Sequence, residues 1–199
     1  MNKVVIYTSI YGKKDTLKDP LQVNKDCDYL CFTDNKDIKS DVWKVIYKEP
    51  THEDPVRCAK IFKIKPHDFL KENNLALLDH SLCGINSTGT LNTRDCIYDE
   101  AAIISAHNKD NPEIVKAQIE KYKKDGYPSK RGLSANSIML KKHNKHDMID
   151  LANMWWEEVE NFSRRDQLSL YYCTWKLNIK HYLLKYPKID IRNNEWFQW

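Results

Sequence analysis

The stretch Leu75-Ala76-Leu77-Leu78-Asp79-His80-Ser81 decides the fold of this chain. Its four apolar residues lead directly into an acid, and a short continuous apolar run is typical of a strand buried on both faces, as in a parallel sheet. A carboxylate at the end of such a strand is costly to bury without a partner. In open α/β sheets that end is where ligands bind. Asp79 is therefore a candidate metal ligand, and the alternative is that it caps the following turn.

Strands and helices alternate around this stretch. Apolar, β-branched and aromatic runs predict further strands over residues 3–10, 28–34, 42–47 and within 132–140. Helix start signals and helical spacing predict helices over residues 54–65, 110–124 and 147–160, and another from about residue 163. This alternation predicts an α/β fold with a central, mainly parallel sheet flanked by helices.

Composition is typical of a soluble globular protein. The chain has 199 residues, 41% of them hydrophobic and 30% charged, which fits one domain over residues 1–199, alone or as part of a longer protein. Its net charge is +4, from 32 Lys and Arg against 28 Asp and Glu. This mild, dispersed excess suits an anionic small molecule, and without a recognised motif it argues against a nucleic-acid partner.

The cysteines and the first residues of the chain indicate the cellular compartment that the protein suits. The six cysteines lack the paired CxxC spacing of a zinc site, and four of them stand in apolar stretches that suit buried free thiols. They are Cys27, Cys31, Cys58, Cys83, Cys96 and Cys173. The chain begins directly with a predicted strand, without a signal-peptide pattern, and has no apolar run of about 18 residues that would span a membrane. We expect a reducing, cytoplasmic location and no membrane span.

A polar loop ends the first predicted strand, at Thr8-Ser9-Ile10-Tyr11-Gly12. It has no GxGxxG pattern, so the fingerprint of dinucleotide-binding proteins is absent. Tyr11 is a candidate platform for a nucleotide base, because an aromatic ring can stack on one. The alternative is an ordinary loop tyrosine.

Two cations stand on the helix that begins at Asp54-Pro55, an acidic N-cap followed by proline at the first position. Arg57 and Lys60 are three residues apart and so share one side of that helix. They are candidates to bind a diphosphate, since cations recognise phosphate oxygens. The alternative is a solvated basic surface.

The chemistry that these residues suit is transfer from a phosphorylated donor. A strand-end carboxylate with a nearby hydroxyl, here Asp79 and Ser81, suits a hard divalent cation such as Mn²⁺ or Mg²⁺. Such an ion neutralises a diphosphate leaving group. Asp166 and Glu158 are the carboxylates predicted to face the reacting carbon of the substrate.

Several stretches together carry a family resemblance that covers nearly the whole chain. They are residues 5–12, 29–34, 57–60 with Pro66-His67, the acid loop at Asp79, 136–140 and 165–169. In this order they resemble small glycosyltransferases of the GT-A fold, such as those encoded by large chlorella viruses. They are also similar to a glycosyltransferase-like family of plants and bacteria.

The resemblance implies transfer of a hexose from a UDP-linked sugar to a glycan or glycoprotein acceptor, with Mn²⁺ as cofactor. Asp79 stands where such enzymes have an Asp-x-Asp metal motif, and Ser81 occupies its third position. His143 corresponds to a late histidine ligand of some GT-A enzymes. A viral source would place the protein in the host cytoplasm.

The same resemblance assigns residues to the donor. The uridine would be held by Thr8, Ile10, Tyr11 and Gly12. The donor sugar would be held by Asn136, Asp166 and Gln167.

Two questions stay open at the level of sequence. A retaining mechanism is favoured because no catalytic base stands out, whereas an inverting enzyme needs a carboxylate beside the acceptor oxygen. The incomplete metal motif also leaves a non-catalytic nucleotide-sugar or carbohydrate binding domain as the alternative function.

Overall fold

The computed structural model describes residues 4–70, 75–79, 111–129, 131–133, 136 and 138–182. The chain falls into two compact units. The first contains the sheet, helix α1 (Pro55–Ile64), the short 3₁₀ helix η1 (Pro66–Asp68) and residues 146–153 of helix α4 (His146–Asn161). The second contains α3 (Pro112–Lys124), α5 (Asp166–Lys176) and residues 154–161 of α4.

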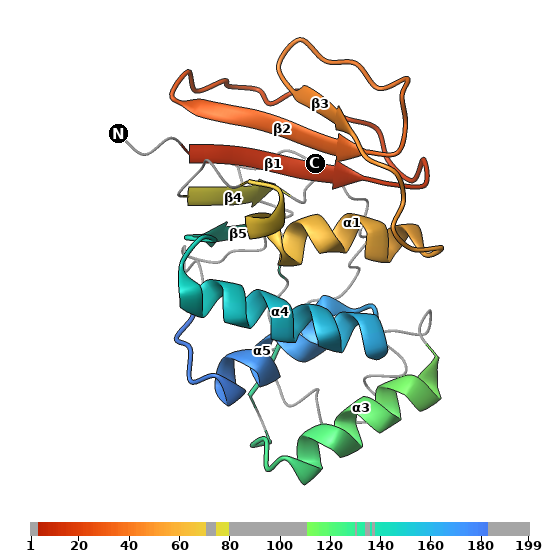
Figure 1. The fold of residues 1–199 in the computed structure, drawn as a ribbon, viewed down its shortest axis with the longest axis vertical. Helices are drawn as coiled ribbons and strands as arrows, with labels where there is room; N and C mark the ends of the chain where they lie inside the picture. Colours follow the sequence, from red (N-terminus) through yellow and green to blue (C-terminus); the bar gives the residue numbers. More distant parts are fainter. Residues whose placement is uncertain are drawn as a thin grey trace. The chain divides into compact units, whose positions relative to one another are not determined.

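The sheet of the first unit has the strand order β3-β2-β1-β4-β5 (Figure 1). Its strands are β1 (Val4–Ile10), β2 (Cys27–Thr33), β3 (Lys44–Tyr47), β4 (Leu75–Asp79) and β5 (Ile138–Lys141). The first four run parallel and β5 pairs antiparallel with β4. This confirms the α/β class and the mainly parallel sheet.

The apolar run over residues 75–78 lies in an inner strand, as predicted. β4 lies between β1 and β5, with Val5 opposite Ala76 on one side and Lys141 opposite Ala76 on the other. The side chain of Ala76 is buried in the main core. Strands of parallel sheets that are covered on both faces have such continuous apolar runs.

The strand order creates a switch point between β1 and β4. From β1 the chain moves outward to β2 and β3 and later returns to place β4 on the opposite side of β1. The parallel strands end at Ile10, Thr33, Tyr47 and Asp79, and we call this side of the sheet the carboxyl edge. The opposite side is the amino edge. In open α/β sheets, ligands bind at the carboxyl edge beside such a switch point.

Helix α1 begins at the carboxyl edge and packs on one face of the sheet. Asp54 is its N-cap and accepts a 3.0 Å hydrogen bond from the Val56 N–H, as the Asp54-Pro55 signal predicted. Phe62 of α1 stacks on Phe32 of β2, with 4.5 Å between the ring centroids. The other face of the sheet has its own apolar cluster, in which Tyr29 meets Trp43 edge to face.

The second unit is helical in its described part. Helix α3 is capped by Asn111, whose side chain accepts from the Glu113 N–H at 3.0 Å. The predicted capping acid, Asp110, lies outside the described residues. Tyr122 of α3 stacks on Tyr172 of α5, with 3.8 Å between ring centroids, so aromatic packing joins these two helices.

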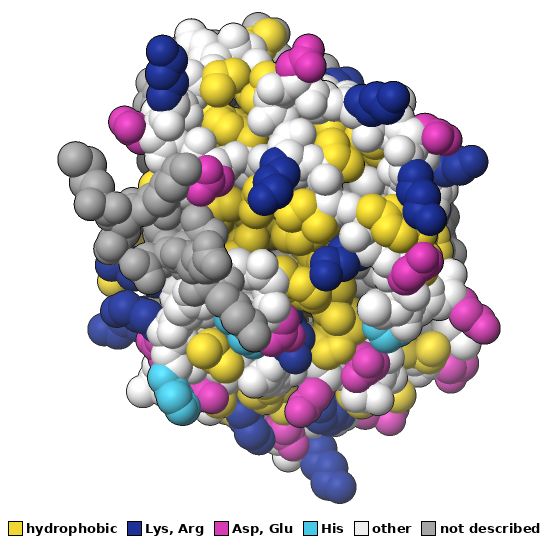
Figure 2. All heavy atoms as spheres, turned by 45° about the horizontal axis from the view of Figure 1, so that its top comes forward, with side chains coloured by type: hydrophobic (Ala, Val, Ile, Leu, Met, Phe, Trp, Pro, Cys, Tyr) yellow, Lys and Arg dark blue, Asp and Glu magenta, His cyan; other side chains and the backbone are white. Residues whose placement is uncertain are grey.

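The surface charges and the free cysteines agree with what the amino-acid composition predicts. On the face that Figure 2 shows, lysine and arginine side chains are interspersed with aspartate and glutamate. Within the described residues, no helix is long and apolar enough to cross a membrane. The four described cysteines, at positions 27, 31, 58 and 173, are free thiols, and burial raises the pKa of Cys31 to about 12.

Candidate functional site

Gly12 anchors the loop that leaves β1 at the carboxyl edge. Its φ of +69° lies in the left-handed region that favours glycine, and a Cβ atom there would sit 2.7 Å from Pro55 Cβ. Its N–H donates to both carboxylate oxygens of Asp34, at 3.2 and 3.0 Å. Glycine is therefore required here by backbone conformation and by the close approach of α1.

Asp34 holds this loop and is a candidate site residue that the sequence did not single out. It directly follows β2, so it lies at the carboxyl edge beside the loop that it holds. The available signal was its place at the end of the strand over residues 28–34, the same signal that singled out Asp79. An acid at this edge can also accept hydrogen bonds from ligand hydroxyl groups.

Tyr11 does not provide a platform for a base, which corrects the sequence prediction. Only 3% of its surface is exposed. Its ring stacks on Phe62 at a centroid distance of 5.6 Å, and its hydroxyl donates to the Lys48 carbonyl at 3.3 Å. Burial raises the pKa of Tyr11 well above its usual value. Tyr11 is a core residue that fixes the base of the loop.

The other predicted uridine residues of β1 are also buried. Ile10 belongs to the apolar cluster opposite α1, so its side chain serves packing. Thr8 is 0% exposed, and its hydroxyl has no hydrogen-bond partner among the described residues. A buried hydroxyl without a partner carries a desolvation cost, which makes Thr8 the unusual member of the strand.

Asp79 ends β4 at the switch point, as expected for the predicted metal ligand. The β1–β4 ladder ends at Tyr7 opposite Leu78, so the Asp79 backbone lies beside Thr8. The β1–β2 ladder continues to Ile10 opposite Thr33. Residues 8–10 therefore extend beyond the last pair with β4. The side chain of Asp79 and all of Ser81 lie outside the described residues.

His143 does not join Asp79, contrary to the proposed metal pair. It follows β5, whose Lys141 pairs with Ala76 at the start of β4, whereas Ile138 pairs with Asp79. The three residue steps from Ile138 to Lys141 correspond to about 10 Å of strand. His143 Nε2 is 2.7 Å from the Leu70 carbonyl oxygen, before β4 begins. The antiparallel direction of β5 thus places this histidine at the amino edge.

Arg57 and Lys60 differ in environment although they share one helix. The Arg57 guanidinium lies 3.4 Å from Asp54 Oδ2 at the start of α1, near the carboxyl edge. Lys60 is only 4% exposed, so it does not belong to a solvated basic surface. A buried ammonium group needs an anionic or polar partner. The diphosphate-binding prediction thus concerns one half-buried and one buried cation.

Asn136 and Asp166 come together in the second unit, as the family resemblance implied. Asn136 Nδ2 donates to Asp166 Oδ2 at 3.4 Å, and both residues are buried. Asn136 has a φ of +54°, a left-handed conformation that asparagine tolerates better than most residues. Asp166 opens α5, and its carbonyl accepts from Trp155 Nε1 at 2.9 Å. Gln167 follows it and is also buried.

Glu158 is a structural residue rather than a carboxylate open to substrate. It is 2% exposed and forms an ion pair with Lys121. Its Oε2 accepts from Tyr122 at 2.8 Å and from Gln118 at 3.4 Å. Burial, followed by the Glu158 charge, raises the pKa of Tyr122. These contacts join α3 to α4 and correct the prediction that Glu158 faces the reacting carbon.

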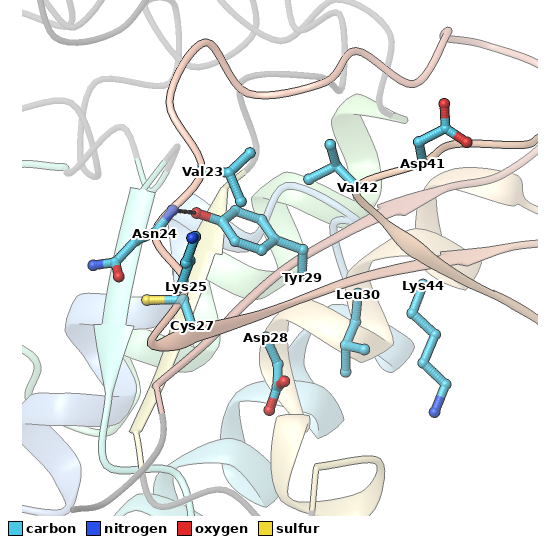
Figure 3. A pocket seen from close by; sticks show the side chains of 10 residues that line it. All are labelled: Val23, Asn24, Lys25, Cys27, Asp28, Tyr29, Leu30, Asp41, Val42 and Lys44. Atoms are coloured by element: carbon cyan, nitrogen blue, oxygen red, sulfur yellow. Dashed lines mark hydrogen bonds between the residues drawn. The ribbon is translucent and has the colours of Figure 1, made fainter.

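A shallow pocket of about 340 Å³ lies at the amino edge. It is lined by the starts of β2 and β3 and the loop before β2, and the Tyr29 ring lies between Val23 and Val42 (Figure 3). β2 is seven residues long, about 20 Å, and this length separates the pocket from the switch point. The pocket is therefore distinct from the predicted donor site. Among the described residues, no group of three or more His, Cys, Asp or Glu side chains could hold a metal ion.

Comparison with known proteins identifies a family. Residues 33–193, which are more than half of the chain, match the TOD1/MUCI70, glycosyltransferase-like domain. No curated protein and no solved structure matches the chain, and the family match gives no support to a viral source. The chain belongs to the TOD1/MUCI70 family of glycosyltransferase-like domains.

Proposed function

We propose that this chain is a glycosyltransferase of the GT-A fold that moves a hexose from a UDP-sugar to a glycan or glycoprotein acceptor. Its family membership suggests a transferase. The observation that supports a nucleotide donor is the switch point between β1 and β4, where the Gly12 loop and Asp79 occupy the carboxyl edge. This is the position at which open α/β sheets bind nucleotides.

In this proposal the first unit binds the nucleotide. Backbone groups of residues 8–12 hold the uracil, and a pocket sized to a pyrimidine rejects the larger purines. Arg57 and Lys60 bind the diphosphate through charge-assisted contacts. Asp34 fixes the loop through the Gly12 N–H and leaves lone pairs for donor hydroxyl groups.

In this proposal a divalent cation binds at the end of β4, where Asp79 would supply a carboxylate. Oxygen donors are what Mn²⁺ and Mg²⁺ prefer, with the remaining positions filled by phosphate and water. When bound, the ion would neutralise charge on the departing diphosphate.

The residues proposed to bind the donor sugar are Asn136, Asp166 and Gln167. Asn136 and Asp166 form one hydrogen-bonded pair, and a carboxylate with an amide suits hydroxyl groups of a sugar. With Glu158 committed to Lys121 and Tyr122, the described residues offer fewer candidates for an acceptor-activating base. This favours the retaining mechanism.

Calorimetry and turnover test the proposal together. The protein should bind UDP more tightly than GDP or ADP, and Mn²⁺ should strengthen that binding. Incubation with UDP-hexoses and Mn²⁺ should release UDP. Equal affinity for all three nucleotides would overturn the uridine assignment. Metal-dependent UDP binding without turnover on any UDP-hexose and acceptor would favour the non-catalytic binding domain.

A further inference from the structure

Two buried histidines near the amino edge are the basis of an inference about pH. His67 belongs to η1, with 10% of its side chain exposed, and His143 follows β5 and is 1% exposed. In each ring the Nδ1 atom is buried and has no hydrogen-bond partner among the described residues. Buried polar atoms in folded proteins are paired with few exceptions, so two such atoms in the first unit need an explanation.

The segment that contains His67 is joined to the end of β5 by two contacts. Lys141 Nζ donates to the carbonyl of Lys63, a buried cation of α1, at 2.7 Å. His143 Nε2 lies 2.7 Å from the Leu70 carbonyl oxygen, and because that oxygen can only accept, Nε2 is the donor. In the chain, η1 lies between Lys63 and Leu70, and the charge of His143 acts on His67. The end of the edge strand β5 is thus held to the turn that follows α1.

The surroundings of His67 favour its neutral form. Its Nε2 faces Asp68 Oδ1 at 3.4 Å, so a further proton must go to the buried Nδ1. Burial is the main reason that the pKa of His67 lies below its ordinary value, and Asp68 acts in the opposite direction. Positive charge on Lys65, Lys141 and protonated His143 lowers this pKa as well. Because Asp68 is 44% exposed and already paired with Lys65 at 3.2 Å, water screens its charge and it compensates poorly.

We propose that the buried His67 imidazole is an acid-sensitive contact, which holds the turn after α1 to the end of β5 when neutral and loosens it when protonated. This inference concerns the fold of the first unit and does not rest on the proposed function. The pKa of His67 in the folded protein lies below the ordinary value of about 6.5. The stability that neutral His67 contributes is therefore fully present above about pH 6.5, and it is lost as the pH falls through the lower pKa of the folded protein.

The imidazole chemical shifts of His67, followed by NMR against pH, measure the proton directly. The control is the same protein unfolded in urea, in which the ring is exposed to water. In the folded protein His67 should become protonated at a lower pH than in the unfolded protein. A midpoint that is equal in both states, or higher in the folded protein, would overturn the inference.

Thermal unfolding against pH compares the wild type with His67→Phe and His146→Gln. Phenylalanine fills a similar space and takes up no proton, whereas the His146 side chain is 93% exposed. Between about pH 6.5 and about pH 5, the wild type should lose stability relative to His67→Phe by up to about tenfold in the unfolding constant per pH unit, because its unfolding takes up one more proton. His146→Gln should follow the wild type closely. Parallel pH profiles of the wild type and His67→Phe would contradict the proposal, and His67→Gln replaces His67→Phe if the latter does not fold.

Amide hydrogen exchange locates the effect. The Leu70 N–H donates to the Pro66 carbonyl at 2.8 Å across η1, and the Tyr127 N–H donates to the Tyr122 carbonyl at 2.9 Å in the second unit. From about pH 7 to about pH 5.5, the protection factor of Leu70 should fall several-fold more in the wild type than in His67→Phe. The protection factor of Tyr127 should respond to pH in the same way in both proteins. An equal loss of protection at Leu70 in both proteins would show that His67 does not control this contact.

Discussion

The amino edge and the carboxyl edge of the sheet both have polar residues, but these residues make different contacts. The amino edge has a shallow, open pocket and a histidine: His143 Nε2 is 2.7 Å from the Leu70 carbonyl oxygen, and its buried Nδ1 has no hydrogen-bond partner among the described residues. The carboxyl edge has a glycine in the left-handed conformation, an acid that holds it, and the buried Thr8 hydroxyl without a partner among the described residues. Because each edge contains a buried polar atom without a partner, such atoms do not by themselves separate the two edges. The strand order does, since open α/β sheets bind ligands at the carboxyl edge beside a switch point, and this is why we propose the donor site there.

The largest effect is expected from Asp79→Asn, which keeps the size of the side chain and removes its charge. Metal-dependent UDP binding and nearly all transfer should disappear. The melting temperature of the metal-free protein should stay similar or rise, because an isolated carboxylate at a strand end is poorly solvated. Calorimetry with and without Mn²⁺ measures the first effect. If Asp79→Asn retains Mn²⁺-stimulated transfer, the metal lies elsewhere.

Gly12→Ala should be the next largest, and Gly126→Ala is its matched control. Both glycines have positive φ, but a Cβ at Gly12 meets Pro55 at 2.7 Å whereas nothing lies within 4 Å at Gly126. The left-handed conformation costs about 1–2 kcal/mol for alanine in either place. Overpacking against Pro55 should add about 1–3 kcal/mol at Gly12. Denaturant unfolding measures the difference, and equal destabilisation would show that Pro55 yields without cost.

Arg57→Ala should weaken UDP binding by roughly 1.5–3 kcal/mol if the guanidinium binds the diphosphate. The fold should be retained, because the side chain is only half-buried and its contact with Asp54 is 3.4 Å long. Titration with UDP and with uridine separates the contributions, since uridine lacks the diphosphate and should bind both proteins equally. An unchanged affinity for UDP would assign Arg57 to a structural role at the start of α1.

The smallest effect is expected at the amino edge. Lys25 lines the pocket beside β2, and Lys25→Ala should leave the affinity for UDP and Mn²⁺ unchanged. His143→Gln should lower the melting temperature through loss of the contact with Leu70, again without changing the metal affinity of the folded protein. A weakened response to Mn²⁺ in either variant would contradict the assignment of the donor site to the opposite edge.

Local signals predicted the framework well. The run over residues 75–79 became an inner parallel strand, and Asp54-Pro55 opened α1 with the expected cap. Hydrophobic pattern and capping are short-range properties, so they are visible in a single sequence. The family resemblance assigned both Asn136 and Asp166 to the donor sugar. These residues are 30 positions apart in the sequence, and they form a hydrogen bond in the structure.

The predictions that were wrong depended on packing between residues far apart in the chain, which a single sequence does not reveal. Tyr11 looked like a loop residue, but Phe62 of α1 draws its ring into the core. His143 lies at the amino edge because β5 runs antiparallel, a direction that the sequence of β5 does not encode. The Glu158 carboxylate accepts hydrogen bonds from residues of α3, which lie about 40 positions earlier in the chain.

The contact between Gly12 and Pro55 couples two parts of the first unit mechanically. Because the space of a missing Cβ is filled by the proline ring, the β1 loop cannot shift toward α1 without moving the start of that helix. Asp34 restrains the same loop from the other strand, through the Gly12 N–H. Ordering of the loop by a nucleotide would therefore be transmitted to the first turn of α1, where slower amide hydrogen exchange at Val56 would report it.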